Sequence, residues 1–440
     1  MQTPPKHLSF ASLHAFQSKL FKKIADSREQ HKVCHTYHDT LMSGFAMMML
    51  QEPSMLQFMQ RAEQPAERTN LHTLFGVKTL PSDSQMREII DDIAPEQIMP
   101  MFDEILKRAQ RAKLLEQYEF LDGYYLAAVD GSQYFSSQEV NCLGCLIKNH
   151  SSGEIWFSHH IVQMAILKKG IPHVLPLAPE EVRNSDGTEK QDCEVNAAKR
   201  LLARIRELHP LLQLVITGDS IYAHKPMIEL LKFLKRYHYI FVVKPGDHKT
   251  LFKDIEGLRK EGLLSTHETR EANGELHRYR WVNEIALVAG ADSPLVNYFE
   301  YEHFNKRGKL TYSCTWITDF PITKENVPKL VEGGRARWKI ENETFNTLKN
   351  QGYHIEHNFG HGKKHLSFNF FLLNLLAFTY HQLFELADKT YQVLRKKFGS
   401  KRNLWDHIRV ALYFFIFNDW QALLDKVFYG GNLPSPSLSG

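Results

Sequence analysis

The feature that most constrains the fold is a set of apolar runs between residues 124 and 247. These runs are YYLAAVD, CLIKNHSSGEIWFSHHIVQMAIL, LVITGD and YIFVVKPGD, and the amphipathic segment CEVNAAKRLLARIREL lies between the second and third. Short apolar runs bounded by turn residues indicate strands, whereas apolar residues at three- and four-residue spacing indicate a helix. Strands that alternate with helices predict a mixed α/β sheet.

The flanking regions have different patterns. Residues 8–120 contain apolar positions at helical spacing, and Ser82 or Asp83 is expected to cap a helix. Strand-like runs between Gly262 and Thr318, ELHRYRWVNEIALVAG and KLTYSCTWIT, predict a β-rich insertion. Helix is expected again from about Gly334 to the tail GGNLPSPSLSG, whose composition predicts disorder.

The composition indicates a soluble protein, with 43% hydrophobic and 24% charged residues in 440. Five cysteines, with no secretory start, favour a reducing compartment, so we expect a cytoplasmic protein. The most apolar stretch, residues 368–380, is too short to span a bilayer and is interrupted by two asparagines, which indicates a buried helix. We therefore expect no membrane partner. The net charge is only +4, but basic residues cluster locally, as in Arg395–Lys397, which allows a polyanion-binding face.

Two carboxylates stand where strand-like runs end. Asp130 closes YYLAAVD and Asp219 closes LVITGD. Asp130 precedes Gly131, and Asp-Gly between apolar runs is also the usual signal of a hairpin turn. Two acids at the carboxyl ends of separate strands in one sheet instead favour a site, because that edge is where α/β sheets place ligands.

A third acid follows from helical geometry in RARWKIENETFNTLK. With α-helical spacing, Glu341 falls on the same stripe as Trp338, Phe345 and Leu348, whereas Glu343 lies almost opposite. A carboxylate that faces inward is costly unless it is paired or bound to a cation. The structural alternative is a buried ion pair between Glu341 and Arg337, one turn earlier.

Three carboxylates brought together repel each other, so a site that contains them requires a multivalent cation. Hard oxygen ligands suit Mg²⁺ or Mn²⁺. Two such ions held by Asp130, Asp219 and Glu341 could activate a water or a 3′-hydroxyl for in-line displacement at phosphorus. The pattern therefore predicts nuclease-type chemistry.

AAVDGSQYF, VITGDSIY and RARWKIENETFNTLK, with a long β-rich stretch between the last two, resemble the catalytic triad of DDE transposases of bacterial insertion sequences. LFGVKTLPSDSQMREIIDDI is similar to the front domain of that family, and EHNFGHGKKHLS to the segment after its acidic helix. The resemblance implies that Asp130, Asp219 and Glu341 are catalytic and bind the metal. It also implies a ribonuclease-H-like core and a dimer or larger assembly on double-stranded DNA, at transposon ends and target.

One branch of that family carries a Tyr-Arg-Glu-Lys signature. Arg337 and Glu341 match it, Gly334 stands at the tyrosine position, and Leu348 stands at the lysine position with Lys349 next. By this resemblance Arg337 and Lys349 would contact DNA. We further expect DNA contacts from Lys244, which closes a strand in KPGDH, and from the basic residues of the later segment, Lys363 and Lys364.

These patterns predict an α/β, ribonuclease-H-like mixed-sheet core with a β-rich insertion, flanked by helical N- and C-terminal regions. The predicted units are a DNA-binding domain at residues 1–120, a first core part at 121–270, the insertion at 271–334, a core helix with the third acid at 335–370, and a helical C-terminal region at 371–440.

Cys142 and Cys145 have the spacing of half a zinc site, and His150, His159 and His160 follow them. The alternative is that they are buried cysteines in a strand. Four later histidines are interrupted by two glycines, so a rigid helical ligand array is not expected and DNA contacts are favoured; they are His354, His357, His361 and His365.

The functional prediction is a DNA transposase that cleaves transposon ends with a divalent metal and joins them to target DNA. Phosphate-binding and dinucleotide fingerprints are missing from the sequence, so no nucleotide cofactor is expected. Two alternatives remain. One is a metal-dependent nuclease or resolvase that never joins strands, and the other is an inert, transposase-derived DNA-binding protein. A bacterial, nucleoid-associated location is expected with the transposase.

Overall fold

The computed structural model describes residues 6–26, 28–184 and 191–430. Its N-terminal part is helical, as predicted, up to the first strand. The helices are α1 (Phe10–Lys22), α2 (Tyr37–Met49), α3 (Met55–Ala62), α4 (Pro65–Phe75), α5 (Asp83–Asp91) and α6 (Pro100–Arg111). Short 3₁₀ turns are η1 (Lys6–Leu8), η2 (Gln30–Lys32), η3 (Pro95–Gln97), η4 (Leu114–Tyr118) and η5 (Ser220–Tyr222). Ser82 caps α5, and Gln85 completes a reciprocal capping box.

The central layer is one mixed sheet of twelve strands within the described residues, ordered β3-β4-β2-β7-β8-β12-β11-β10-β9 with three short strands at its sides. The strands are β1 (Glu119–Leu121), β2 (Tyr124–Ser137), β3 (Leu146–Asn149), β4 (Ile155–Ile166), β5 (Leu175–Pro176), β6 (Glu180–Val182), β7 (Leu214–Gly218), β8 (Tyr237–Val242), β9 (Ser265–Arg270), β10 (Leu276–Ala286), β11 (Leu295–Phe304) and β12 (Leu310–Thr318). Strands β2, β7 and β8 run parallel, whereas β4 pairs antiparallel with β2.

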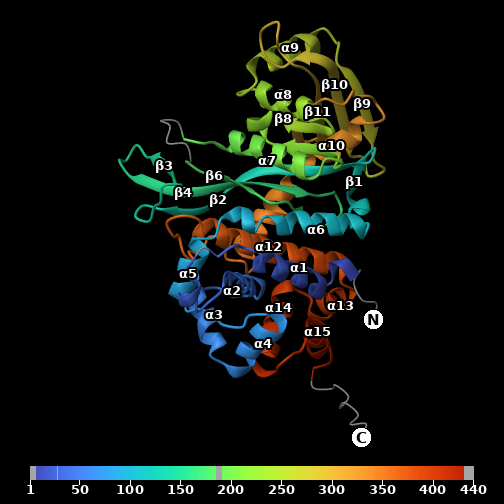
Figure 1. The fold of residues 1–440 in the computed structure, drawn as a ribbon. Coiled ribbons are helices and arrows are strands. Elements are labelled where there is room, and N and C mark those ends of the chain that lie inside the picture. The colour runs from blue at the N-terminus through green and yellow to red at the C-terminus, as the bar shows by residue number, and fades with distance from the viewer. Residues whose placement is uncertain (1–5, 27, 185–190, 431–440) are drawn as a thin grey trace.

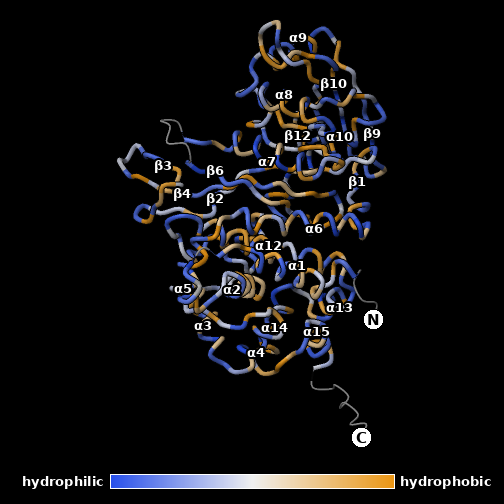
Figure 2. The backbone as a smooth tube through the Cα atoms, viewed as in Figure 1, coloured by the Kyte–Doolittle hydropathy of each residue, from blue (hydrophilic) through white to orange (hydrophobic). Residues whose placement is uncertain are grey.

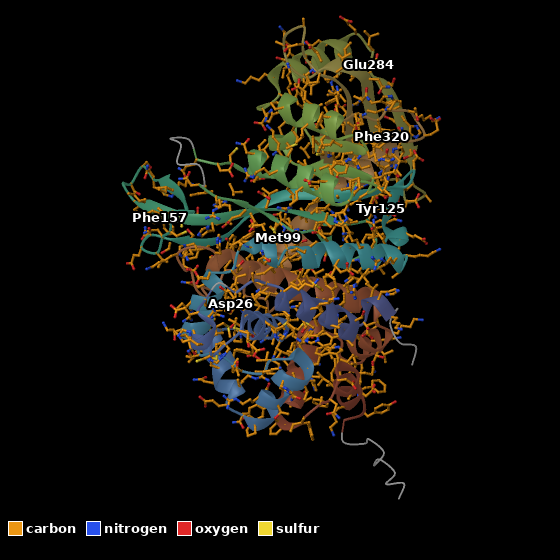
Figure 3. The ribbon with its side chains drawn as sticks, viewed as in Figure 1. Asp26, Met99, Tyr125, Phe157, Glu284 and Phe320 are labelled. Carbon is orange, nitrogen blue, oxygen red and sulfur yellow. The ribbon has the colours of Figure 1, made fainter. Side chains whose placement is uncertain are left out.

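The predicted β-rich insertion extends this sheet, because β12 pairs antiparallel with β8 and β9–β12 continue from it. At the opposite end, β2 and β4 form a long hairpin arm. Figure 3 marks its two ends with Tyr125, at the start of β2, and Phe157, which pairs with Ser137. The sheet therefore joins the arm, the parallel core strands and the insertion in one layer (Figure 1).

Helices cover the sheet on both sides in Figure 1. On one side are α7 (Glu194–Leu208) and α8 (Lys225–Leu234), with α9 (Lys249–Lys260) beyond them. On the other side lie α6 and α12 (Leu366–Ala387), and α12 touches the hairpin arm where the rings of Phe371 and Tyr134 lie 4.9 Å apart. The remaining helices are α10 (Val327–Arg335), α11 (Asn346–Asn350), α13 (Lys389–Phe398), α14 (Lys401–Phe414) and α15 (Trp420–Tyr429).

The N- and C-terminal helices share one hydrophobic core below the sheet (Figure 1). The Tyr380 hydroxyl donates to Gln17 Oε1 at 2.7 Å, and the Asn70 amide donates to the carbonyls of Leu412 and Phe415. These contacts satisfy polar groups that would otherwise be costly to bury. The front helices are therefore packed against the C-terminal helices.

Helix α12 confirms the predicted buried helix. It is 22 residues long, longer than the predicted stretch, and Figure 2 shows its hydrophobic residues beneath the sheet. Among the described residues it alone is long and apolar enough to cross a membrane, by length and composition only, and 83% of its apolar window is buried inside the protein. The predicted disordered tail, residues 430–440, lies outside the described residues except for Gly430.

Candidate active site

Asp130 lies inside strand β2 and not in a turn. Its Cα pairs with that of Gln163 on β4, and the next pair is Gly131 with Val162. The strand then continues to Ser137, so the alternative that Asp130 and Gly131 form a tight hairpin turn is wrong. A Cβ at Gly131 would collide with the Glu194 carboxylate, so a larger residue here would displace that carboxylate. The glycine that suggested a turn instead leaves room for a second acid.

Asp219 follows directly after β7, the parallel neighbour of β2. Ala128 of β2 is in register with Thr217 of β7, so Asp130 and Asp219 stand two positions further along their chains. Adjacent parallel strands bring such residues to the same edge of a sheet. Two of the three predicted acids are therefore neighbours at the carboxyl edge.

The surroundings of Asp130 disfavour its negative charge. Burial raises its pKa to about 6, and the charges of Glu194 and Asp219 add to the rise. Arg337 opposes this shift, and its Nη1 lies 3.2 Å from Asp130 Oδ2. The arrangement holds more negative charge than the nearby cations neutralise, which is a common feature of functional sites.

Asp219 is kept ionised. Burial works against its charge, but the N–H of Ser220 and the ammonium group of Lys244 outweigh it and lower the pKa of Asp219. Lys244 follows β8, and its Nζ lies 3.0 Å from Asp219 Oδ1. The structure thus places Lys244 beside the acid pair, as its position after a strand predicted.

The structure contradicts the predicted burial of Glu341. Glu341 is exposed, and Trp338, expected on the same buried stripe, is 47% exposed, whereas Lys339 is buried. The reason is a π-helix at η6 (Ile340–Phe345), preceded by a break after α10. A π-helix has more residues per turn than an α-helix, so the three- and four-residue spacing no longer selects one face.

The alternative ion pair between Arg337 and Glu341 is not formed either, because Arg337 binds Asp130 instead. Glu341 nevertheless belongs to a segment that lies against β2. Among the described residues, Asp130, Asp219 and Glu341 do not bring their carboxylate oxygens within 4.8 Å of one another. The third acid therefore lies in a segment against the strand of Asp130, and the three acids do not form one close cluster.

Helix α10 begins at Val327, earlier than predicted. Its close approach to the sheet explains why position 334 is glycine and not the tyrosine of the Tyr-Arg-Glu-Lys signature. A Cβ at Gly334 would lie 2.5 Å from Nε1 of Trp316 on β12, so only glycine fits without a shift. A tyrosine cannot occupy this position. Arg337 lies in the turn just after α10 and reaches Asp130 from there.

Comparison with protein families decides the identity of the central segment. Residues 181–379 match the family model of the transposase DDE domain. This segment is therefore similar to a transposase DDE domain. The predicted resemblance to DDE transposases of insertion sequences is thereby confirmed, and so is the ribonuclease-H-like fold class. The match includes Asp219 and Glu341, whereas Asp130 precedes it. A search of curated proteins found no match.

The transposase family implies DNA binding and the use of divalent metal ions. The residues of the acid pair fit such an ion, since Asp130 and Asp219 offer hard oxygens, and burial together with the charges of Glu194 and Asp219 raises the pKa of Asp130. A divalent cation at this edge would favour the ionised form of Asp130 against its burial and the neighbouring carboxylates.

Sequence reasoning missed Glu194, which lies beside the acid pair. It is the first residue of α7, where an acid is already explained by the helix dipole, so no separate sequence signal marks it. In the structure its Oε1 accepts a hydrogen bond from the Tyr222 hydroxyl at 2.6 Å, and its charge contributes to the raised pKa of Asp130. A fourth carboxylate therefore lies beside the predicted acids.

The other predicted DNA-binding residues lie on the chain after the π-helix. Lys349 forms an ion pair with Glu356 at 2.8 Å, and Lys364 forms one with Asp92 at 2.6 Å, while Lys363 is exposed. Asp91 accepts the four successive backbone N–H groups of residues 363–366. This carboxylate caps α12 from α5 and fixes the segment that presents the two lysines.

Cys142 and Cys145 lie in a turn before β3, so the alternative that they are strand residues is wrong. Their sulfurs face His159 and also His361, which was expected only as a DNA contact. His150 and His160 do not belong to this group among the described residues.

Proposed function

We propose that the protein is a DNA transposase that cleaves the ends of a DNA element and joins them to target DNA. The observation that carries the proposal is the placement of Asp130 and Asp219 side by side at the carboxyl edge of a transposase DDE domain, with the pKa of Asp130 raised to about 6. Such an edge suits a divalent cation, whose charge compensates those of the carboxylates, and a phosphodiester that binds to this cation.

In this proposal Asp130 and Asp219 hold the metal ions, and Glu341 completes the set. When bound, two Mg²⁺ or Mn²⁺ ions would activate the attacking oxygen and stabilise the leaving oxygen of an in-line displacement. Glu341 is exposed and stands on a π-helix, a conformation frequent at functional sites, so its carboxylate is free to turn toward the acid pair. The negative charge of Glu194 contributes to the raised pKa of Asp130.

The basic residues would bind the phosphates. Lys244 stands beside Asp219 and would contact the scissile strand, and Arg337 would transfer from Asp130 to a phosphate when the acids gain a cation. Lys349, Lys363 and Lys364 would bind DNA further along, together with the helices of residues 1–120 and 371–440. Phosphate contacts position the DNA and carry little sequence information.

The chemistry needs no energy-rich cofactor. In the first step water attacks a phosphodiester at the element's end, the bond from phosphorus to the 3′-oxygen breaks, and a 3′-hydroxyl is freed. In the second step this 3′-hydroxyl attacks a phosphodiester of the target, forming a new bond to phosphorus while the 3′-oxygen of the target leaves. We place this activity in the bacterial cytoplasm, at the nucleoid, in a dimer or larger assembly on DNA.

The test is cleavage and joining of DNA that carries the sequences flanking the reading frame, with Mg²⁺ or Mn²⁺. Wild type should cut and join, whereas Asp130→Asn and Glu341→Gln should bind DNA without making product. Asp254→Asn, an exposed acid on α9, is the control and should remain active. Cutting without joining would instead indicate a nuclease, and binding without product in wild type would indicate an inert DNA-binding protein.

A further inference from the structure

Four metal-binding side chains meet outside the acid pair. Cys142 and Cys145 come from the turn before β3, His159 comes from β4, and His361 comes from the segment between α11 and α12. All four ligand atoms lie within 4.8 Å of one another. Cys145, His159 and His361 are buried, and Cys142 is half-buried. The four side chains therefore form a compact cluster with little access to solvent.

The distances between these atoms match a tetrahedron around one ion. The two sulfurs are 3.8 Å apart, the three resolved sulfur–nitrogen distances are 3.5, 3.5 and 3.4 Å, and the two Nε2 atoms are 3.1 Å apart. Zinc bonds of ~2.3 Å to sulfur and ~2.0–2.1 Å to nitrogen in a tetrahedron give edges of about 3.8 Å, about 3.5 Å and about 3.3 Å, respectively. A disulfide is excluded, because its sulfurs would be only about 2.05 Å apart.

The surroundings hold each ligand in a metal-binding form. His361 Nδ1 lies 2.9 Å from the carbonyl of Gly362, to which it donates, so its Nε2 is left as a lone-pair donor. His159 Nδ1 faces Glu181 Oε1 at 3.4 Å, in the arrangement of a carboxylate behind a ligating imidazole. The N–H of Cys142 points at the sulfur of Cys145 at 3.4 Å. These contacts orient both imidazoles and one thiol toward the centre.

We propose that Cys142, Cys145, His159 and His361 bind a structural zinc ion. Two thiolates with two imidazoles select zinc over Mg²⁺, which prefers oxygen ligands. Four protein ligands leave no open position for substrate or water, so the ion would serve structure and not catalysis. This site is separate from the Mg²⁺ or Mn²⁺ ions expected at Asp130 and Asp219.

The zinc would fix the segment after the acidic helix to the hairpin arm. Cys145 and His361 are 216 residues apart in sequence, and the first lies just beyond β2, the strand of Asp130, while the second precedes Lys363 and Lys364. Asp91 anchors the same segment from the opposite side. Zinc would therefore hold the basic segment in place. Only this consequence for DNA binding rests on the proposed function, since the metal site does not.

The experiment measures zinc in the purified full chain by mass spectrometry of the metal. Wild type should contain one zinc per chain, and Cys142→Ser and His361→Gln should lose it. Cys193→Ser and His160→Gln are the matched controls, since they change the same residue types outside the group and should retain zinc. Zinc retained in full by both ligand variants, or wild type that takes up no zinc when it is supplied, would overturn the proposal.

A second measurement does not depend on how the variants fold. Wild type refilled with Co²⁺ should show the intense visible bands of tetrahedral cobalt together with thiolate charge-transfer absorption. The weak spectrum of octahedral cobalt with oxygen ligands would overturn the proposal. Zinc removal by a chelator should lower Tm and speed proteolysis within residues 351–365, whereas unchanged Tm and proteolysis would contradict the structural role. These readouts need no DNA, so their failure is distinguishable from failure of the transposase proposal.

Discussion

Replacing Asp130 by asparagine should make the protein more stable while it removes catalysis. The side chain of Asp130 is only 22% exposed, and the charged groups of Glu194 and Asp219 lie near it. Asparagine has nearly the same shape and carries no charge. The variant therefore removes the electrostatic cost and keeps the packing.

The magnitude follows from the pKa of Asp130, which is raised from 3.8 to about 6. At ~1.36 kcal/mol for each pH unit, ionised Asp130 costs on the order of 3 kcal/mol of folding free energy above the folded-state pKa. Because the folded pKa is the higher one, the cost is absent below about pH 4 and grows as the pH rises to about 6. The variant leaves Arg337 without this partner, so we expect a gain of ~1–3 kcal/mol at pH 8.

The assay is thermal unfolding of wild type and Asp130→Asn from pH 4 to pH 8 without divalent cations. The variant should unfold several degrees higher at pH 8, and the difference should disappear as the pH falls toward 4. Mg²⁺ or Mn²⁺ should then raise the Tm of wild type more than that of the variant, because only wild type offers the Asp130 carboxylate. Asp254→Asn, an exposed acid, should change neither quantity.

Two results would refute this reasoning. Equal stability at pH 8 would mean that Asp130 carries no electrostatic cost in the folded protein. A stability gain that is the same at pH 4 and pH 8 would mean that packing, and not charge, causes it.

Three further predictions concern other parts of the structure. Asp91→Asn should cost ~1–2 kcal/mol of unfolding free energy at pH 7, measured by urea unfolding. Burial raises the pKa of Asp91, but backbone N–H donors outweigh it and lower the pKa, so this loss should fade only as the pH drops below the unfolded value of 3.8. No loss of stability at pH 7 would contradict the cap that Asp91 provides for α12. Gly334→Ala should destabilise the protein by ~1–3 kcal/mol through its clash with Trp316. Gly257→Ala, at a helical glycine in open space, should instead stabilise it by ~0.5–1 kcal/mol. Equal effects of the two variants on unfolding would argue against the close approach of α10 to Trp316. Replacing Lys363 and Lys364 by alanine should reduce the salt slope of DNA binding by ~1.8, at ~0.9 per phosphate contact, and an unchanged slope would exclude contacts from this pair.

The sequence predicted the parts of the fold that local patterns determine. The apolar runs became β2, β4, β7 and β8, and the amphipathic segment between the second and third became α7. The sheet also brought Asp130 and Asp219 to neighbouring positions, because acids at the ends of adjacent parallel strands share an edge. The spacing of apolar residues and the position of each acid along its strand suffice for these predictions.

The remaining features depend on contacts that local patterns do not contain. Glu341 was placed by α-helical spacing, which the π-helix breaks. Gly334 is required by an indole on β12, and the Glu194 carboxylate occupies the space where a Cβ at Gly131 would lie. His361 lies 216 residues from Cys145, so this fourth ligand of the proposed zinc site could not be recognised from the local Cys/His pattern.

The central claim is that the acids at the sheet edge carry out strand transfer. The most direct test is joining of a precut DNA end with a free 3′-hydroxyl to a plasmid target, because it isolates the second step. With Mg²⁺ or Mn²⁺ wild type should form joined product, and Asp219→Asn should bind the same end and form none. Joined product from Asp219→Asn, or none from wild type bound to its end, would contradict the claim.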